Sequence, residues 1–344
     1  MVVRALAAPF LAAFVLAFAP AAPVAAQGVT LRLHQFLPAQ SFVPANILDP
    51  WADRIEVESG GRIRIERFPS MQLGGRPADL VDQAVDGVVD IIWTLPGYTP
   101  GRFPRSEVFE LPFLIDDAEG ASRAFWEIAQ SDMAATDFKD LQILGTWVHG
   151  PGVIHASRPV LRLEDMAGLK LRAPSRITAR LLEGLGAVAL GMAVPAVPEA
   201  LARGVIDGTL LPWEVTSSIR AAELVHNHTE FPGRAVYVAT FILAMNKGRY
   251  AALPADLRAI IDAASGAEFS AQAGRLQQAA DAPMRAEAVA MGNRVTLLDE
   301  AEVARWQAAA EPVVAGWLAE LAAAGIDGAD LLARTRAALA AHGG

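Results

Sequence analysis

Cysteine is absent from this chain of 344 residues, so no disulfide framework holds it together and thiol catalysis is excluded. Basic residues are in the minority: 29 lysines and arginines against 38 aspartates and glutamates give a net charge of −9. This balance argues against nucleic acid and against an anionic membrane surface as partners. It does not argue against a small anionic ligand, because one buried arginine dominates its local site. Stability must come from a hydrophobic core, and the length suits two domains.

The common motifs of bond-making chemistry are missing as well. The sequence contains no G-x-S-x-G elbow, no H-E-x-x-H motif, no P-loop and no EF-hand loop. His226 and His228 form the only close histidine pair, and metal sites usually have more ligands at helical or turn spacing. A solvated loop is therefore favoured over a metal site at this pair. We predict a protein that is not an enzyme and that holds neither a cofactor nor a metal.

Only the N-terminal region contains a long apolar run. Arg4 precedes ALAAPFLAAFVLAFAPAAP, and the small residues VAAQ follow at 24–27. A short basic region, an apolar region and small residues before a cleavage point are typical of a secretory signal. Prolines interrupt the run, which falls short of the roughly 20 apolar residues that a membrane span needs. We predict a cleaved signal peptide over 1–26 and an exported chain that does not itself span a membrane.

The next segments alternate between the periodicities of strand and helix. VTLRLHQFLP (29–38) alternates apolar and polar residues, which predicts a strand that ends in a loop. A helix is predicted over 47–59, stopped by two glycines, and a second strand over 62–69. Strand, helix and strand at this spacing predict a βαβ unit with parallel strands.

Two segments far apart in the chain resemble each other. Residues 82–96 are DQAVDGVVDIIWTLP, and residues 199–212 are EALARGVIDGTLLP. In each, a predicted helix ends at glycine, a short strand begins with Val-Val-Asp or Val-Ile-Asp, and a proline follows. The repetition predicts two similarly built α/β lobes. Because ligands bind beyond the carboxyl ends of strands in open α/β sheets, we expect an interlobe cleft lined by Trp93 and Trp213.

The C-terminal third has a different character. YVATFILAMN (237–246) is rich in β-forming residues and predicts a strand that crosses between the lobes. From Pro254 onward, alanine-rich stretches carry apolar residues at helical spacing. We expect these helices to pack against both lobes rather than to take part in chemistry.

The stretch GLKLRAPS (168–175) carries the strongest candidate for a ligand contact. Arg172 stands at the end of a short predicted strand, and Pro174 prevents the chain from continuing as a helix at Ala173. The guanidinium presents a planar fork that matches a carboxylate in a bidentate manner. A structural ion pair is the alternative, and the expected cleft favours a ligand.

Seven motifs in chain order identify a resemblance to a known family. They are RFPSMQLGG (67–75), VVDIIW (88–93), VFELPFLI (108–115), EDMAGLKLRAP (164–174), LGAVALGM (185–192), GVIDG (204–208) and MNKGRYAALPADLR (245–258). Together they resemble the DctP-type extracytoplasmic solute-binding proteins of TRAP (tripartite ATP-independent periplasmic) transporters. The resemblance covers nearly the whole exported chain, and LKLRAP and V-D-G are its most specific parts.

This resemblance implies an α/β, two-lobed periplasmic binding protein fold of type II-like architecture. The cleft would lie between the lobes, with the C-terminal helices packing across both. We expect lobe I over 27–149 with 238–277 returning to it, and lobe II over 150–237 with the helices of 278–344 packing on it. The protein would capture an organic acid in the periplasm and deliver it to the small and large subunits of a membrane permease. The alternative is a periplasmic sensor component of a signalling system, because the two classes share a fold.

The family's ligand-pairing arginine corresponds to Arg172. Sialic-acid-binding relatives carry a second pocket arginine near the position of Gly152, and many relatives carry an asparagine where Leu211 stands. An aromatic residue and a glutamate of the family pattern are replaced by Val194 and Ala196. With one evident cation in the pocket, a monocarboxylate is predicted over a dicarboxylate, unless Arg102, Arg176 or His149 supplies a second one.

Further side chains are candidates for ligand contact. Flat apolar walls for an aromatic or branched acid are expected from Phe36, Trp93, Tyr98 and Trp213. His149 is predicted to donate a hydrogen bond to a ligand oxygen. Glu214 is predicted either to accept from a ligand hydroxyl or to pair with a nearby arginine.

Overall fold

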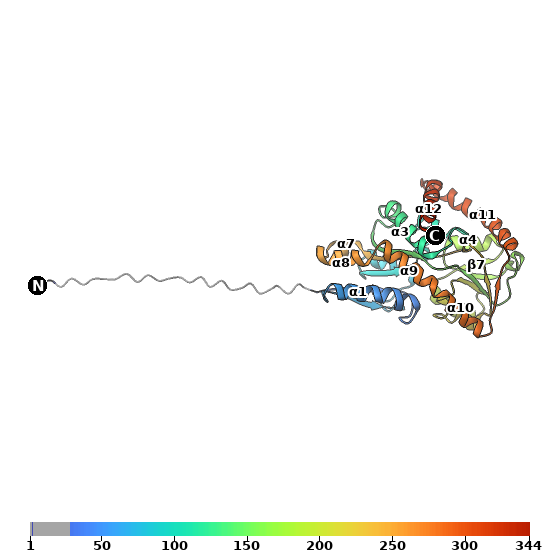
Figure 1. Cartoon of the computed structure of the whole chain (residues 1–344), viewed down its shortest axis with the longest axis horizontal. Coiled ribbons are helices and arrows are strands. Elements are labelled where there is room, and N and C mark those ends of the chain that lie inside the picture. Colours follow the sequence, from blue (N-terminus) through green and yellow to red (C-terminus); the bar gives the residue numbers. More distant parts are fainter. Residues whose placement is uncertain (1, 3–27) are drawn as a thin grey trace.

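The chain forms two lobes, each built around its own β-sheet (Figure 1). The computed structural model describes Val2 and residues 28–344, so the rest of the predicted signal peptide over 1–26 lies outside the described residues. Within residues 28–344, no helix is both long enough and apolar enough to cross a membrane. One large hydrophobic cluster runs through both lobes, and the predicted α/β two-lobed architecture is confirmed.

The sheet of the first lobe has five strands in the order β2-β1-β3-β10-β4. Their bounds are β1 Val29–His34, β2 Ile63–Phe68, β3 Ile91–Thr94, β4 Leu141–Val148 and β10 Thr240–Asn246. Strand β1 pairs in parallel with β2 and β3. The connection from β1 to β2 runs through the π-helical turn η1 (Pro44–Leu48) and α1 (Asp49–Glu58), so the predicted βαβ unit is confirmed.

The sheet of the second lobe has six strands in the order β11-β9-β5-β8-β6-β7. Their bounds are β5 Val153–Ala156, β6 Lys170–Ala173, β7 Val188–Gly191, β8 Gly208–Leu211, β9 Asn227–Glu230 and β11 Arg294–Leu297. Strand β6 lies parallel to both β7 and β8, and β5 runs antiparallel to β8 and β9. Strand β11 was not predicted, and it lies between two alanine-rich stretches that were expected to be helical.

The two similar segments of the sequence occupy corresponding places in the two lobes. Helix α2 (Leu80–Val85) leads into β3 of the first sheet, and α5 (Val197–Ala202) leads into β8 of the second. Each helix is followed by a glycine with positive φ, 72° at Gly87 and 66° at Gly204. Left-handed backbone at this point is accessible to glycine without strain, which explains why the same pattern occurs twice.

Four short connections join the lobes, and the last of them is formed by residues 324–327 near the C-terminal end. Residues 149–152 run from β4 of the first sheet to β5 of the second, and residues 235–239 return from the second lobe to β10. The first two connections are tied together, because Gly152 N donates to the Tyr237 carbonyl at 3.1 Å. The third connection is Ala280, between α9 (Ala267–Ala279) and α10 (Asp281–Ala290). Strand β10 thus belongs wholly to the first sheet, and the crossing precedes it.

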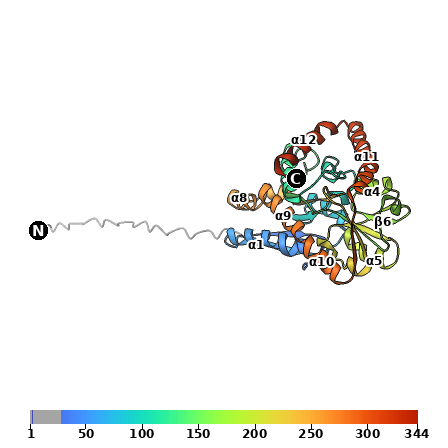
Figure 2. The ribbon, with the colours of Figure 1, turned by 45° about the vertical axis from the view of Figure 1, so that its right-hand side comes forward.

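The remaining helices cover the outer faces of the sheets. They are α3 Ala118–Ile128, α4 Arg176–Gly184, α6 Ala221–Leu224, α7 Lys247–Ala251, α8 Ala255–Ala264, α11 Glu300–Ala323 and α12 Gly328–His342. Helix α11 packs on α4 of the second lobe, and α12 packs on α3 of the first (Figure 2). The last helices therefore bridge both lobes. The predicted assignment of all of 278–344 to lobe II differs from this at α12.

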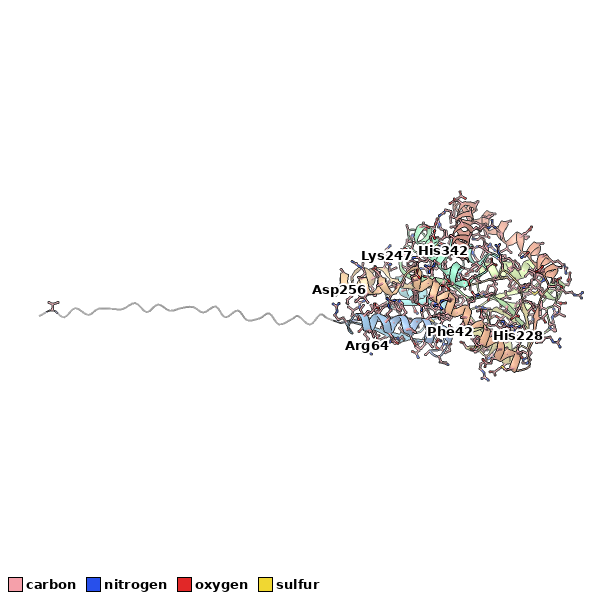
Figure 3. The ribbon with its side chains drawn as sticks, in the orientation of Figure 1. Phe42, Arg64, His228, Lys247, Asp256 and His342 are labelled. Atoms are coloured by element: carbon pink, nitrogen blue, oxygen red, sulfur yellow. The ribbon has the colours of Figure 1, made fainter. Side chains whose placement is uncertain are left out.

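Labelled side chains mark the two lobes in Figure 3. Arg64, Lys247 and Asp256 lie on the first lobe, near the end from which the chain enters, whereas His228 lies on the second. Phe42 lies between these two groups, where the lobes meet. The same interlobe region contains the cavity described next.

Candidate ligand-binding site

Arg172 is held at the carboxyl end of β6 with almost no exposure to solvent. The strand is buried from Leu171 to Ala173, and Arg172 itself is 2% exposed. Its Nε donates to the Met192 carbonyl at 2.9 Å, and its Nη1 donates to the Leu210 carbonyl at 3.1 Å. These two bonds fix the guanidinium plane, and the Tyr98 hydroxyl lies beside it. Neither bond uses Nη2, so this side of the fork can bind a further acceptor.

No carboxylate among residues 28–344 forms an ion pair with Arg172. Its two acceptors are neutral carbonyl oxygens, so its charge is buried without a counter-ion in the protein. An isolated buried charge is costly, and buried charges are normally paired. The arrangement therefore argues against the structural ion pair that the sequence left open, and it favours an external anion.

Arg172 lines a cavity between the lobes. The centre of a water-sized sphere can move through about 40 Å³ of this cavity. Both lobes contribute to its wall, and so do the connections formed by residues 149–152 and 235–239. The lining residues are Phe36, Leu37, Val43, Trp93, Leu95, Tyr98, His149, Arg172, Pro174, Val194, Leu211, Pro212, Glu214, Val215, Tyr237, Ala239, Phe241 and Gln277. All predicted ligand contacts except Trp213 are thus brought together here, although ligand contact itself stays a prediction.

Stacked aromatic rings form one wall of the cavity. The rings of Phe36 and Trp93 lie parallel with centroids 4.6 Å apart, and Phe241 stacks near Trp93 at 5.5 Å. Trp147 lies behind them, 6.3 Å from Trp93, and Tyr98 meets Phe36 edge to face. Because each ring fixes the next, the wall is rigid, flat and suited to an aromatic ligand.

Tyr98 also connects the two lobes. Its hydroxyl accepts a hydrogen bond from the Val194 N–H at 3.0 Å, across the interlobe boundary. Burial raises the pKa of this phenol, so Tyr98 stays neutral at physiological pH. The resemblance implied an aromatic residue at the position of Val194, and here the backbone of Val194 makes the polar contact.

His149 lines the cavity but does not have the predicted donor role. Its Nδ1 lies 2.6 Å from the Gly150 carbonyl, and its Nε2 accepts from the Ala239 N–H at 2.9 Å. Both ring nitrogens are therefore occupied by backbone, with the proton on Nδ1. Burial and the nearby charge of Arg172 lower the pKa of His149 to about 4. The ring is neutral, fastens two interlobe connections to each other, and supplies no second cation.

Trp213 lies outside the cavity, which corrects the prediction that it forms a ligand wall. Its neighbours Pro212 and Glu214 line the cavity, and the indole between them points the other way. Its Nε1 donates to Glu230 at 2.8 Å, and its ring packs against the two buried histidines at positions 155 and 228. A 3-10 turn begins directly after Trp213 and ends the strand-like alternation, and the sequence pattern alone did not reveal this turn.

The two buried histidines contact each other. His155 and His228 approach through their Nδ1 atoms at 2.7 Å, and His226 contacts Asn293. Burial lowers the pKa of His155 to about 3 and of His228 to about 4. Within residues 28–344 no group of three or more potential metal ligands is present. The two histidines that are close in the sequence, His226 and His228, therefore contact different residues.

Glu214 is the only carboxylate among the residues that line the cavity. It begins the 3-10 turn η8 (Glu214–Thr216) after β8 and is 1% exposed. Its Oε2 accepts from Gln277 Nε2 at 2.9 Å, while its Oε1 is buried without a partner among the described residues. Burial raises the pKa of Glu214 to about 7. It is not paired with an arginine, so the second of its two predicted roles is excluded in this structure.

Tyr237 and Phe241 are cavity residues that the sequence analysis did not select. They flank the start of β10, in the segment predicted to cross between the lobes. Tyr237 explains the glycine at 152, because a Cβ at Gly152 would lie 2.0 Å from its ring. An aromatic ring therefore occupies the space beside Gly152, near which the resemblance to sialic-acid-binding proteins implied a second arginine. Leu211, at the position where the resemblance implied an asparagine, adds a further apolar surface.

The site therefore offers one fixed cation, a flat aromatic wall and one buried carboxyl group. Two arginines considered as a second cation are engaged elsewhere. Arg176 pairs with Glu107 and Glu320, and Arg102 pairs with Asp82 at 2.5 Å. Neither lines the cavity. Arg172 is the single cationic side chain of its lining, which suits an anion with one carboxylate.

Comparison with known proteins agrees with this geometry. The family described as bacterial extracellular solute-binding protein, family 7 (DctP), matches residues 35–320. An outer membrane transporter protein, TsaT of Comamonas testosteroni, is 28% identical over 92% of this chain and 94% of its own. A solute-binding protein of Verminephrobacter eiseniae is 31% identical over 84% of this chain and 85% of its own.

Solved structures resemble the fold over almost its whole length. A TRAP solute-binding protein from Rhodoferax ferrireducens, in complex with copurified benzoate, is 50% identical with a TM-score of 0.90 over 92% of this chain and 98% of its own. A marine metagenome TRAP protein specific for aromatic acids, with 3-hydroxybenzoate, is 39% identical with a TM-score of 0.90, covering 92% and 99%. One from Bordetella bronchiseptica, with bound mandelate, is 30% identical with a TM-score of 0.84, covering 90% and 98%.

Proposed function

The chain belongs to the bacterial extracellular solute-binding proteins of family 7, and from this premise we propose that it captures an aromatic monocarboxylate in its interlobe cavity. In this role Arg172 pairs with the ligand carboxylate, and the stacked rings of Phe36, Trp93 and Phe241 receive the ligand ring. The protein is a receptor of the TRAP type, like the solved proteins that it resembles.

The observation that carries this proposal is the buried charge of Arg172. Its fork lacks a carboxylate partner among residues 28–344 and faces a cavity whose other walls are mostly apolar. A ligand carboxylate supplies the missing counter-ion and forms charge-assisted hydrogen bonds with the free side of the fork. Burying the rest of the ligand against the rings contributes roughly 25 cal/mol per Å² of apolar surface.

The absence of a second cation supports one carboxylate rather than two. Arg102 and Arg176 are paired with acidic residues, and His149 is neutral. Glu214 adds a carboxyl group to the same wall, so a second ligand carboxylate there meets an unfavourable like charge. The solved relatives in complex with benzoate, 3-hydroxybenzoate and mandelate bind acids of the proposed class.

The setting of this binding follows from the family and from the N-terminal sequence. We infer that residues 1–26 direct export and are removed, so that the receptor works in the periplasm. It would then deliver its acid to the small and large membrane subunits of a TRAP permease. Binding, and no chemical conversion, is the expected activity.

A thermal-shift panel tests the proposed ligand class. Benzoate, cyclohexanecarboxylate, succinate and malate are compared at equal concentration, since a bound ligand stabilises the folded state by RT ln(1 + [L]/Kd). Benzoate is expected to raise the melting temperature most, cyclohexanecarboxylate less, and the two dicarboxylates least. Greatest stabilisation by succinate or malate would contradict the proposal.

A further inference from the structure

Glu214 has an unused hydrogen-bonding atom within the cavity lining. Its Oε1 is buried and has no partner among the described residues, although the side chain is 1% exposed. A buried acceptor left without a partner costs free energy comparable to a lost hydrogen bond. Native structures rarely leave such a group unsatisfied unless a water or ligand completes it.

The carboxyl group is oriented by a chain of hydrogen bonds. Trp147 Nε1 donates to Gln277 Oε1 at 2.9 Å, which fixes the amide so that its Nε2 donates to Glu214 Oε2 at 2.9 Å. On the backbone side, the Glu214 N–H donates to Asp281 Oδ1 at 2.8 Å. These contacts use one carboxylate oxygen and determine the position of the other. The unpartnered Oε1 is thus held in place rather than free to turn outward.

A second unpartnered polar atom belongs to the same lining. The Nε1 of Trp93 is buried without an acceptor, while its ring stacks on Phe36 and Phe241. The lining therefore contains one buried acceptor and one buried donor that have no partner among the described residues. A hydroxyl group is complementary to both, since it can donate to a carboxylate oxygen and accept from an indole N–H. An ammonium group lacks the acceptor, and a second carboxylate would meet Glu214 with like charge.

We propose that Glu214 is a specificity-determining residue that accepts a hydrogen bond from a ligand hydroxyl, so that the preferred ligand is a hydroxylated aromatic monocarboxylate. The inference rests on the proposed function, because Arg172 must hold the carboxylate for the hydroxyl to reach Glu214. Arg172 and Glu214 both line the cavity, and a ligand carboxylate that pairs with Arg172 leaves Glu214 to another group of the ligand. The hydroxyl therefore sits on the ring, away from the carboxylate.

The test is a calorimetric titration of benzoate and of 2-, 3- and 4-hydroxybenzoate into the full-length exported protein. Wild type is expected to bind at least one hydroxybenzoate about ten- to hundredfold more tightly than benzoate, the usual contribution of a hydrogen bond to a charged group. In Glu214→Leu this affinity ratio should fall to about one. Glu214→Gln, which keeps an acceptor oxygen, should recover part of the ratio.

Glu110 provides a matched control. Like Glu214, it is a buried glutamate. Its Oε1 accepts a hydrogen bond from Thr240, and its Oε2 has no partner among the described residues. Unlike Glu214, it does not line the cavity. Glu110→Gln should therefore keep the wild-type ratio. A wild type that binds benzoate as tightly as all three hydroxybenzoates, or a Glu214→Leu variant that keeps the preference, would overturn this inference alone. Failure of every aromatic acid to bind would instead overturn the proposed function, and this inference with it.

Discussion

At the scale of single residues, the account depends on which polar groups the protein itself satisfies. His149 and Tyr98 have backbone partners and hold the cavity in shape. Arg172 and Glu214 each keep part of their hydrogen-bonding capacity unused. Only the second kind of residue is available to a ligand, so hydrogen-bond partners separate ligand contacts from supporting residues more clearly than residue type does.

Aromatic residues divide in the same way, and this gives a prediction. Phe241 lines the cavity, whereas Trp213 packs against histidines outside it. Phe241→Leu should weaken benzoate binding roughly three- to tenfold, because a ring contact contributes about 0.5–1.5 kcal/mol beyond its buried area. Trp213→Phe should leave the affinity unchanged. Isothermal titration of both variants measures this, and a larger loss in Trp213→Phe than in Phe241→Leu would show that the wall is assigned wrongly.

Burial of Glu214 predicts a dependence of stability on pH. Its pKa is raised to about 7 in the folded protein from an ordinary value of 4.5, so folding is opposed as pH rises through this interval. The hydrogen bond from Gln277 on α9 acts against this rise. Asp281 on α10, whose own pKa burial raises to about 8, is present in both proteins, so the difference between them reports Glu214. The melting temperature of Glu214→Gln minus that of wild type should grow by several degrees between pH 5 and pH 8. A difference that stays constant over this range would contradict a raised pKa of the buried Glu214.

Sequence reasoning succeeded at single residues where one strand fixes the direction of a side chain. Arg172 was found because it ends a strand and precedes Pro174, and the structure places it at that point. Trp213 was misplaced because its direction depends on a tight turn whose geometry is set by contacts with β9 and α10. Tyr237 was missed because its role depends on Gly152, which is distant in the sequence and adjacent only after folding.

At the scale of elements, local sequence patterns predicted short supersecondary units. The pairing of strands that are distant in the sequence assembles these units into sheets. The βαβ unit of β1, α1 and β2 was predictable, because its strands are close in sequence and its periodicities are clear. The insertion of β10 between β3 and β4 was not predictable from local patterns. It pairs strands that are far apart in the sequence, because the chain of the second lobe lies between β4 and β10. Strand β11 was also missed, since its exposed edge position gives it no continuous apolar run.

One ion-pair cluster joins elements of the two lobes. Arg176 on α4 donates to Glu107 on the 3-10 turn η4 (Ser106–Glu110) at 2.5 Å, and to Glu320 on α11 at 2.6 Å. Burial raises the pKa of Glu107 to about 7, and the Arg176 charge acts against that rise. Since η4 belongs to the first lobe and α4 to the second, this contact stabilises the observed arrangement of the lobes around the cavity.

Removal of this interlobe contact should weaken binding without touching the cavity. Arg176→Met leaves Glu107 without its cationic partner, so closure becomes less favourable and benzoate affinity should fall about tenfold. Arg180→Met is the matched control, because Arg180 contacts Glu320 but makes no ion pair with Glu107. Titration calorimetry that finds equal affinities for Arg176→Met and wild type would exclude a role for the pair in closure.

At the scale of the whole molecule, the cavity exists only because two lobes meet. Residues from both sheets and from the connections 149–152 and 235–239 form its wall, and α11 and α12 span the lobes on the outside. Binding between lobes joined by short connections is typical of hinge closure. Local patterns predicted the two lobes, whereas the shape of the cavity depends on how they dock, which no local pattern encodes.

The central claim is that the Arg172 guanidinium holds the carboxylate of an aromatic acid, and calorimetric titration of benzoate tests it most directly. Loss of one member of a buried charge pair costs about 2–5 kcal/mol, so Arg172→Ala should weaken binding by tens to thousands of fold. Arg172→Lys should also lose affinity, because an ammonium does not reproduce the planar fork. Arg158→Ala, at an exposed arginine of the same lobe, should bind as wild type does. Near-normal benzoate affinity in Arg172→Ala or Arg172→Lys would contradict the claim.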